Sequence, residues 1–267
     1  MMKNQLNPRD SLPLSLRALR LPSFVAYHDE VARRAEKEGW SFTQYLSHLA
    51  EQELRERQDR RIERLLKASN LPLEKTMATL NLSRLAVNVR RQVPSLCEGD
   101  FVRRAENLLA FGLPGRGKSH LVAAIAHELV KRGISVLFTP AYALVQQLLK
   151  AKKELLLERV LKKLDRIEAV ILDDIGYIQQ DHQEMEVLFT FLAERYERRT
   201  VVITSNLVFS QWDKIFKDPM TTMAAIDRLV HHSVILELTG PSYRNEEAEK
   251  KNGSGKGTRK GKGKAQQ

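Results

Sequence analysis

A chain of 267 residues, 42% of them hydrophobic, can bury a substantial core and is long enough for one large domain and one smaller one. Cys97 is the only cysteine, which excludes an internal disulfide and argues against a thiolate zinc cluster, and the seven histidines lack an HExxH spacing. No apolar run approaches the roughly 20 residues of a membrane-spanning helix, so we expect a cytoplasmic protein. The net charge of +11 is uneven, with +5 over residues 1–110, +2 over 111–245 and +4 over 246–267, so both ends could meet a polyanion.

Residues 1–80 are predicted to form a small all-helical domain. Ser41 and Gln44 have the spacing of a capping box, in which each side chain accepts the backbone N–H of the other residue at the start of a helix. Apolar side chains then recur near one face of that helix, at Phe42, Tyr45, Leu46, Leu49 and Leu54.

The stretch 55–67 is strongly basic around an apolar stripe. Its cationic side chains could follow a phosphate backbone, and they are Arg55, Arg57, Arg60, Arg61, Arg64 and Lys67. The alternative is a solvated helix face whose arginines pair with Glu56, Asp59 and Glu63, and the residues alone favour this second interpretation.

The fold class follows from the residues after a connector, 81–106. Short apolar runs that alternate with helical patterns predict an α/β domain over 107–245 with a five-stranded, mostly parallel sheet covered by helices. The expected strands are 107–111, 134–138, 169–173, 200–204 and 233–238, with a helix at 119–132. The basic segment 246–267 has no apolar residue larger than alanine, which predicts a disordered tail that either binds a polyanion or only aids solubility.

The glycine-rich loop between the first strand and its helix carries the clearest chemistry. It fits G-x-x-x-x-G-K-[ST] at Gly112, Gly117, Lys118 and Ser119, in the strand–loop–helix context that this phosphate-binding motif requires. Glycines allow backbone N–H groups to approach phosphate oxygens, and the helix N-terminus favours the negative charge. We expect Lys118 to reach the β- and γ-phosphates of ATP and Ser119 to hold Mg²⁺. The predicted cradle consists of Gly112, Leu113, Pro114, Gly115, Arg116, Gly117, Lys118, Ser119 and His120.

Polar residues follow two further strands. In "AVILDD" Asp173 could hold hydrated Mg²⁺ beside the phosphate loop, and Asp174 could orient or deprotonate a water, although it could also be a helix cap. In "VVITSN" the amide of Asn206 could hydrogen-bond both this water and the γ-phosphate. Without the neighbouring motifs, Asn206 would be interpreted as an ordinary turn asparagine. Arg228 could be a surface arginine paired with Asp227.

The segments "GLPGRGKSHL", "ILDDIGYI", "ERYERRTVVITSNLVFSQW", "DRLVHH" and "GPSYR", in this order, resemble the IstB-type transposition helper ATPases. Relatives of that family are the DnaC-type helicase loaders and DnaA-type initiators of the AAA+ class. The resemblance runs from about Leu14 to Arg244, because the N-terminal helical region is also similar.

The resemblance implies a role for each site residue. Lys118 and Ser119 correspond to Walker A, Asp173 and Asp174 to Walker B, Asn206 to sensor I, and Arg228 to an arginine finger that acts on a neighbouring subunit. It also implies a DNA-binding N-terminal region, which raises Arg55 to Lys67 to the favoured interpretation, and an extra helical insertion that adds Lys150, Lys152 and Lys153 as DNA candidates. Family members often have glutamate where Asp174 stands, so slow hydrolysis is expected.

The function that the resemblance implies is an ATPase, with ATP and Mg²⁺ as cofactors, that oligomerises on duplex DNA and assists a transposase in target selection. One alternative is a replicative helicase loader, which would prefer single-stranded DNA. Another, from a different class, is a scaffold that binds ATP and DNA without turnover.

Overall fold

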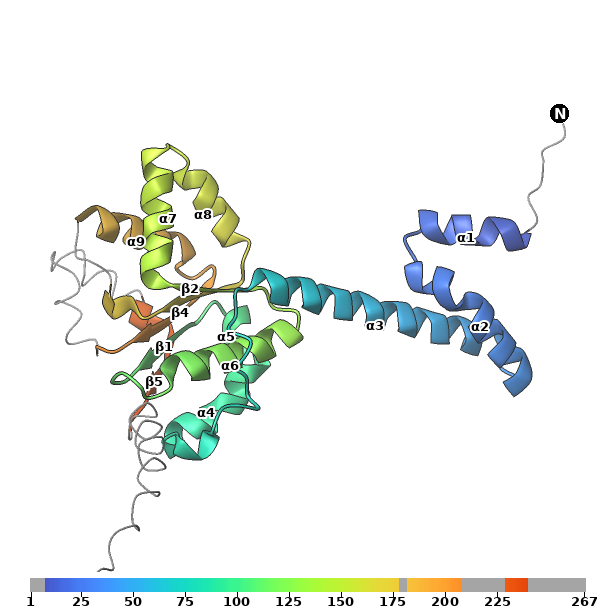
Figure 1. Ribbon diagram of the computed structural model, residues 1–267, viewed down its shortest axis with the longest axis horizontal. Helices are drawn as coiled ribbons and strands as arrows, with labels where there is room; N and C mark the ends of the chain where they lie inside the picture. The colour runs from blue at the N-terminus through green and yellow to red at the C-terminus, as the bar shows by residue number, and fades with distance from the viewer. Residues whose placement is uncertain (1–7, 178–181, 208–228, 240–267) are drawn as a thin grey trace, which may run out of the picture. The chain divides into compact units, whose positions relative to one another are not determined.

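The structure, a computed structural model, describes residues 8–177, 182–207 and 229–239, and its contacts divide the chain into two units, Met1–Arg64 and Leu65–Gln267. Arg228 and the basic segment 246–267 therefore lie outside the described residues. The described part contains the elements labelled in Figure 1.

Three helices make up the described part of the first unit, and the third continues into the second unit: α1 (Pro8–Ala18), α2 (Pro22–Glu38) and α3 (Phe42–Ala68). Pro22 occupies the first turn of α2, where its missing N–H costs nothing, and Gly39 ends that helix in the left-handed conformation at φ 66°. The capping box at the start of α3 is confirmed, since Gln44 Oε1 accepts the Ser41 N–H at 2.7 Å and Ser41 Oγ accepts the Gln44 N–H at 3.2 Å.

The apolar core of the first unit is small. Leu16, Val31, Ala35 and Leu49 are buried, whereas three of the apolar residues that the helical pattern groups with Leu49 are exposed, namely Phe42, Leu46 and Leu54. The inner face of α3 is partly polar instead, because it also carries the buried side chain of Glu53.

Glu53 is the centre of a polar contact between α2 and α3. Its carboxylate accepts the N–H of Ser23, in the first turn of α2, at 2.8 Å and the Nε–H of Arg57 at 2.6 Å. Arg57 also donates to the carbonyl of Arg20, and Ser23 Oγ donates to Glu56 at 2.9 Å. Burial by itself raises the pKa of Glu53, but the hydrogen bonds from Arg57 and Ser23 outweigh it and hold the pKa below its ordinary value. Glu53 is therefore an ionised cap for the N-terminus of α2.

A parallel five-stranded sheet is the framework of the second unit, as the sequence predicts. Its order is β2-β3-β4-β1-β5, and every neighbouring pair is parallel. The strands are β1 (Asn107–Phe111), β2 (Val136–Pro140), β3 (Ala169–Asp173), β4 (Thr200–Ser205) and β5 (Ser233–Glu237). Residues of β1, β3 and β4 are almost completely buried, which is typical of a sheet with both faces covered.

Helices pack on both faces of this sheet (Figure 1). One face is covered by α6 (Lys118–Lys131), with α4 (Val87–Glu98) against it, and α5 (Asp100–Arg103) leads into β1. The other is covered by α7 (Ala141–Lys153) and α9 (His182–Arg195), with α8 (Leu157–Asp165) against both. The short helices η1 (Leu82–Arg84) and η2 (Ile175–Tyr177) complete the described elements. None of the helices in the described ranges is both long and apolar enough to cross a membrane.

One buried arginine joins the elements at the amino ends of the strands. Arg195 is only 2% exposed, and its guanidinium donates to the carbonyls of Leu164, Ile167, Glu168 and Thr200 at 2.9–3.1 Å. Burial lowers its pKa to about 10, so it remains charged at neutral pH. Arg195 therefore supplies the donors that these backbone carbonyls need away from water.

Candidate nucleotide-binding site

The site is formed where β1, β4 and β3 end side by side. Parallel neighbours place their carboxyl ends at the same edge of the sheet, and ligands of open α/β sheets bind at that edge. The loop after β1 contains the G-x-x-x-x-G-K-[ST] motif, Asp173 is the last residue of β3, and Asn206 directly follows β4. The three polar segments that the sequence predicted are thus carried by adjacent strands.

The glycine loop enters α6 through Gly117, which has φ 85° and is the N-cap of that helix. At Gly112 a Cβ atom would lie 2.5 Å from the carbonyl oxygen of Leu238, so a side chain cannot be accommodated there. Lys118 begins α6 and is 7% exposed; its Nζ donates to the carbonyls of Gly112 at 2.6 Å and Leu113 at 3.3 Å. The ammonium group is therefore held beside the loop that would bind the phosphates.

Thr204 connects the two acidic residues at the end of β3. Its Oγ1 donates to Asp173 Oδ1 at 2.6 Å and accepts the backbone N–H of Asp174 at 2.8 Å. Asp174 has φ 64°, a left-handed conformation that aspartate tolerates better than most residues. The chain thus turns sharply after Asp173, and the turn is held by a buried hydroxyl of the neighbouring strand.

Asn206 is closely surrounded. Ser205 Oγ donates to the Leu207 carbonyl at 2.9 Å and accepts the Leu207 N–H at 3.1 Å, which shapes the turn that carries Asn206. Gly176, in η2, leaves the space for the amide, because a Cβ atom there would lie 2.2 Å from Asn206 Oδ1. This Oδ1 is buried and has no hydrogen-bond partner within the described protein, so a donor from a ligand or a water is needed to satisfy it.

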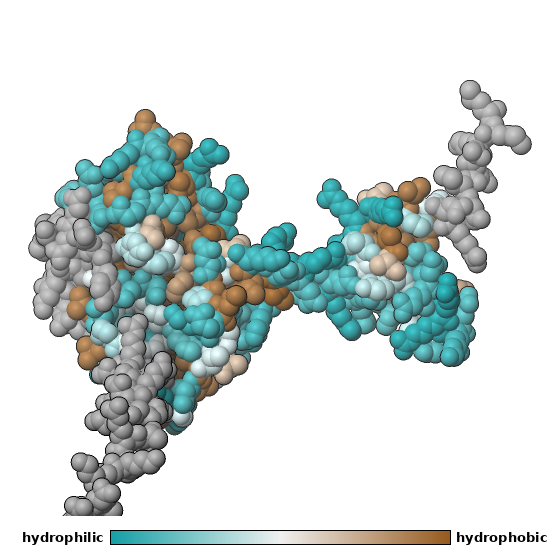
Figure 2. Space-filling view, viewed as in Figure 1, coloured by the Kyte–Doolittle hydropathy of each residue, from teal (hydrophilic) through white to brown (hydrophobic). Residues whose placement is uncertain are grey.

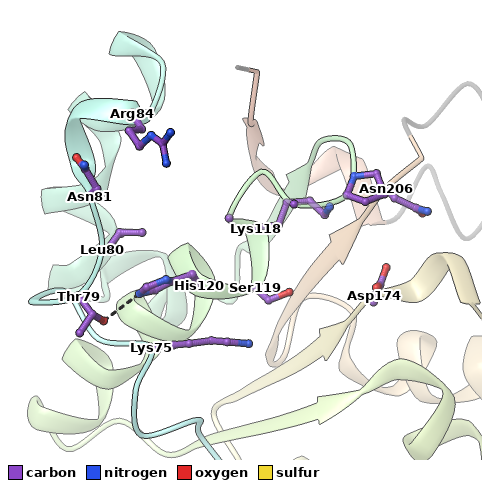
Figure 3. A pocket seen from close by; sticks show the side chains of 13 residues that line it. Lys75, Thr79, Leu80, Asn81, Arg84, Lys118, Ser119, His120, Asp174 and Asn206 are labelled. Atoms are coloured by element: carbon purple, nitrogen blue, oxygen red, sulfur yellow. Dashed lines mark hydrogen bonds between the residues drawn. The ribbon is translucent and has the colours of Figure 1, made fainter. Parts of the chain in front are cut away.

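A pocket of about 430 Å³ brings these groups together (Figure 3). It is lined by Lys118, Ser119 and His120 from the start of α6, together with Asp174 and Asn206. Asp173 does not line this pocket, but it adjoins Asp174, and its Oδ1 is occupied by Thr204.

Sequence reasoning missed a second wall of the pocket. Residues 72–84, here called the strap, precede the sheet, and five of them line the cavity opposite Asp174 and Asn206 (Figure 3). The strap is tied to α6, because His120 Nε2 lies 3.1 Å from Thr79 Oγ1 and His127 Nε2 lies 3.0 Å from the Pro72 carbonyl. No local pattern in the sequence indicates these contacts. The strap residues in the pocket are Lys75, Thr79, Leu80, Asn81 and Arg84.

The residues present fit a magnesium–nucleotide complex. Ser119 and Asp173 offer the hard oxygen ligands that Mg²⁺ prefers. In the described ranges no three His, Cys, Asp or Glu side chains form a cluster that could hold a metal alone, so such an ion would take its other ligands from phosphates and water, as Mg²⁺ commonly does. The buried acceptor of Asn206 suits a water beside the phosphates.

The DNA candidates on α3 make local ion pairs. Arg55 lies 3.4 Å from Glu51, Arg57 pairs with Glu53, and Arg60 lies 3.7 Å from Glu56. Glu56, which the alternative interpretation named as a partner, is therefore engaged. All six basic residues of this stretch are nevertheless exposed.

The DNA-binding candidates on α7 lie close in the sequence to an exposed leucine. Lys150 lies 3.9 Å from Glu154 and Lys152 lies 2.5 Å from Glu186, while Lys153 is exposed. Leu155, in the turn to α8, is 93% exposed, and Figure 2 shows a hydrophobic spot at this end of the α7–α8 pair with hydrophilic side chains around it.

Three comparisons agree on what the chain is similar to. The sequence profile described as "IstB-like ATP binding protein" matches residues 14–251. A protein of Sinorhizobium fredii (strain NBRC 101917 / NGR234) with the name "Putative insertion sequence ATP-binding protein y4iQ/y4nD/y4sD" is 43% identical over 92% of this chain and 84% of its own length.

Solved structures support the fold. The crystal structure of DnaI has a TM-score of 0.54 at 21% identity and covers 64% of this chain and 96% of its own. The replication initiator DnaA bound to AMPPCP and single-stranded DNA has a TM-score of 0.55 at 16% identity, over 72% of this chain and 59% of its own. The architecture is thus that of the P-loop AAA+ proteins, with a helical N-terminal region, as the sequence predicts.

Proposed function

The chain belongs to the IstB-like ATP binding protein family, and from that premise we propose that it is an AAA+ ATPase that oligomerises on duplex DNA and assists a transposase in target selection. The observation that carries the ATPase part is the single pocket in which Lys118, Ser119, Asp174 and Asn206 meet at the ends of three adjacent strands. A protein that only binds a nucleotide needs the phosphate loop alone. Hydrolysis of a phosphoanhydride also requires groups that activate and orient a water, such as a carboxylate and an amide beside the loop.

Each described residue of the site has a role that its position supports. Lys118 binds the β- and γ-phosphates, and Asp174 accepts the proton of the attacking water. Asn206 orients this water through the buried Oδ1. Ser119 and Asp173 would hold Mg²⁺, which, when bound, neutralises charge that develops on the phosphates. Arg228, beyond the described residues, acts on the nucleotide of a neighbouring subunit.

Hydrolysis is expected to be slow and to depend on DNA or a partner. Asp174 is shorter than the glutamate that the family often carries, and its backbone is fixed by the hydrogen bond to Thr204. Turnover then acts as a switch, because loss of the γ-phosphate removes the contact of Arg228 between subunits.

DNA binding rests on the exposed cationic side chains of α3 and α7 and on the net charge of +11. Contacts of lysine and arginine with phosphates are largely independent of sequence and weaken steeply with salt. A transposase is the expected partner because a relative of the chain carries the name of an insertion sequence protein.

The test is size-resolved binding to a duplex of about 60 base pairs, long enough for several subunits that contact phosphates, with ATP, ADP or no nucleotide. Large complexes should form with ATP alone and should be lost in Lys118→Ala and in Arg228→Ala. Equal complexes under all three conditions would refute the ATP-dependent assembly.

Two further measurements separate the alternatives. Stronger binding to a single strand than to the duplex would favour the helicase loader, whose fold the chain shares. Assembly without release of phosphate, in the presence of DNA and transposase, would identify a scaffold that does not hydrolyse ATP. Phosphate release that DNA stimulates would support the proposed ATPase.

A further inference from the structure

Thr204 lies at the carboxyl end of β4, two residues before Asn206, and is completely buried. A threonine hydroxyl has one proton to donate and lone pairs to accept with. In this chain the proton goes to the carboxylate of Asp173 and a lone pair accepts the N–H of Asp174. Both partners of the hydroxyl are therefore the acidic residues of the site.

A buried threonine in a strand more often satisfies its hydroxyl on a nearby backbone carbonyl. Thr200, at the other end of β4, does this: it is equally buried, and its Oγ1 donates to the Glu106 carbonyl at 3.0 Å. The two residues are four positions apart in one strand, so their side chains lie on the same face. Thr200 is therefore a buried threonine on the same face of β4 whose hydroxyl makes no contact with the acidic residues of the site.

We propose that Thr204 is a positioning residue for the Mg²⁺–ATP site, a role that rests on the proposed function. Its hydroxyl orients the carboxylate of Asp173 so that the other oxygen of this carboxylate is left for the metal. The same hydroxyl holds the backbone of Asp174 in the left-handed turn that presents its side chain to the pocket. Partners of this kind fix ligand geometry, and their loss commonly costs ~10–100-fold in metal affinity or activity.

The decisive substitution is Thr204→Val, which keeps the shape of the side chain and removes only the hydroxyl. Thr204→Ser restores the hydroxyl, and Thr200→Val is the matched control that loses a buried hydroxyl from the same strand. The affinity for AMPPCP is measured by calorimetry with Mg²⁺ titrated and with EDTA, so that the readout does not depend on turnover.

In Thr204→Val the Mg²⁺ concentration for half of the metal-dependent increase in affinity should rise ~10–100-fold, while affinity in EDTA stays within about threefold. The kcat for ATP hydrolysis should fall with little change in KM. Thr204→Ser and Thr200→Val should behave as wild type. Unfolded protein in a preparation lowers the apparent kcat but does not move the Mg²⁺ concentration at the midpoint, so this midpoint is the decisive readout. Thr204→Cys, with a weakly donating thiol of similar size, is a second variant that should resemble Thr204→Val.

The proposal is overturned if Thr204→Val keeps the wild-type dependence on Mg²⁺, or if Thr200→Val changes it equally. Failure of the proposed function looks different. In that case wild type itself does not bind AMPPCP, or Lys118→Ala binds it as well as wild type, whatever residue stands at position 204.

Discussion

Gly176→Ala is expected to abolish most of the ATP hydrolysis without unfolding the protein. The backbone of Gly176 does not have the positive φ that makes alanine strained, so the substitution acts only through the added methyl group. This Cβ would lie 2.2 Å from Asn206 Oδ1, which is far inside any normal contact. The atom it meets is the end of a side chain, so the amide can move away.

The size of the effect follows from that distance. To reach an ordinary contact, Asn206 Oδ1 must retreat by about 1 Å, and a misplacement of this size in a catalytic group can cost ~10²-fold in rate. Stability should change little, because the amide oxygen has no hydrogen bond to lose within the described protein. Nucleotide affinity should also persist, since Lys118 and the glycine loop are untouched.

Phosphate release at saturating ATP and thermal melting measure the two quantities. The control is Gly39→Ala, where the left-handed backbone costs about 1 kcal/mol but no atom lies within 4 Å, so stability should fall and hydrolysis should not. In the background of Asn206→Ala the effect of Gly176→Ala should vanish, because the two changes act on one group. Wild-type hydrolysis in Gly176→Ala, or an equal loss in both backgrounds, would refute the reasoning.

Glu53→Gln should lower the free energy of unfolding by about 2 kcal/mol at pH 7, as measured by urea melts. The pKa of Glu53 is depressed in the folded state, so its stabilising contribution is present above the pKa of the unfolded state and is lost as the pH falls through the pKa of the folded state. The difference in stability between the variant and wild type should therefore close in acid. Arg195→Met should cost about 3 kcal/mol, because four backbone carbonyls lose a buried donor, and an unchanged melting temperature would contradict this. Lys153→Ala should weaken duplex binding and reduce the slope of log affinity against log salt by about one, whereas Arg57→Ala should first lower the melting temperature, since its partner Glu53 is buried.

The sheet and the phosphate loop are predictable because their signals are local. The runs at 107–111 and 169–173 coincide with β1 and β3, since a buried parallel strand is apolar throughout. The second strand was expected at 134–138 but spans Val136–Pro140. Gly133 has φ 79° and the Ile134 N–H donates to the Leu129 carbonyl at 3.1 Å, so Ile134 closes the end of α6 in a Schellman-type turn.

Polar groups that the fold buries were not predictable from local pattern. The contacts that matter join residues about 30 positions apart in the sequence, namely Thr204 with Asp173, Asn206 with Gly176, and Arg195 with Leu164. Hydrophobic periodicity carries no information about such partners. The same limit applies to α3, where Glu53 occupies the inner face that its apolar neighbours were expected to fill.

Residues between α3 and β1 pack on the second unit, which agrees with a division of the contacts within α3. Immediately after α3, the Ser69 carbonyl accepts the Phe138 N–H of β2 at 2.7 Å, and Leu71 and Leu80 are buried. His120, the residue after Ser119, contacts Thr79. The polypeptide that leaves α3 is therefore hydrogen-bonded first to the sheet, and it contacts α6 through Thr79, which lies between the pocket-lining residues Lys75 and Arg84. A displacement of the strap is thus opposed by its contacts with α6 at Pro72 and Thr79, so less ordering entropy remains to be lost when a nucleotide binds.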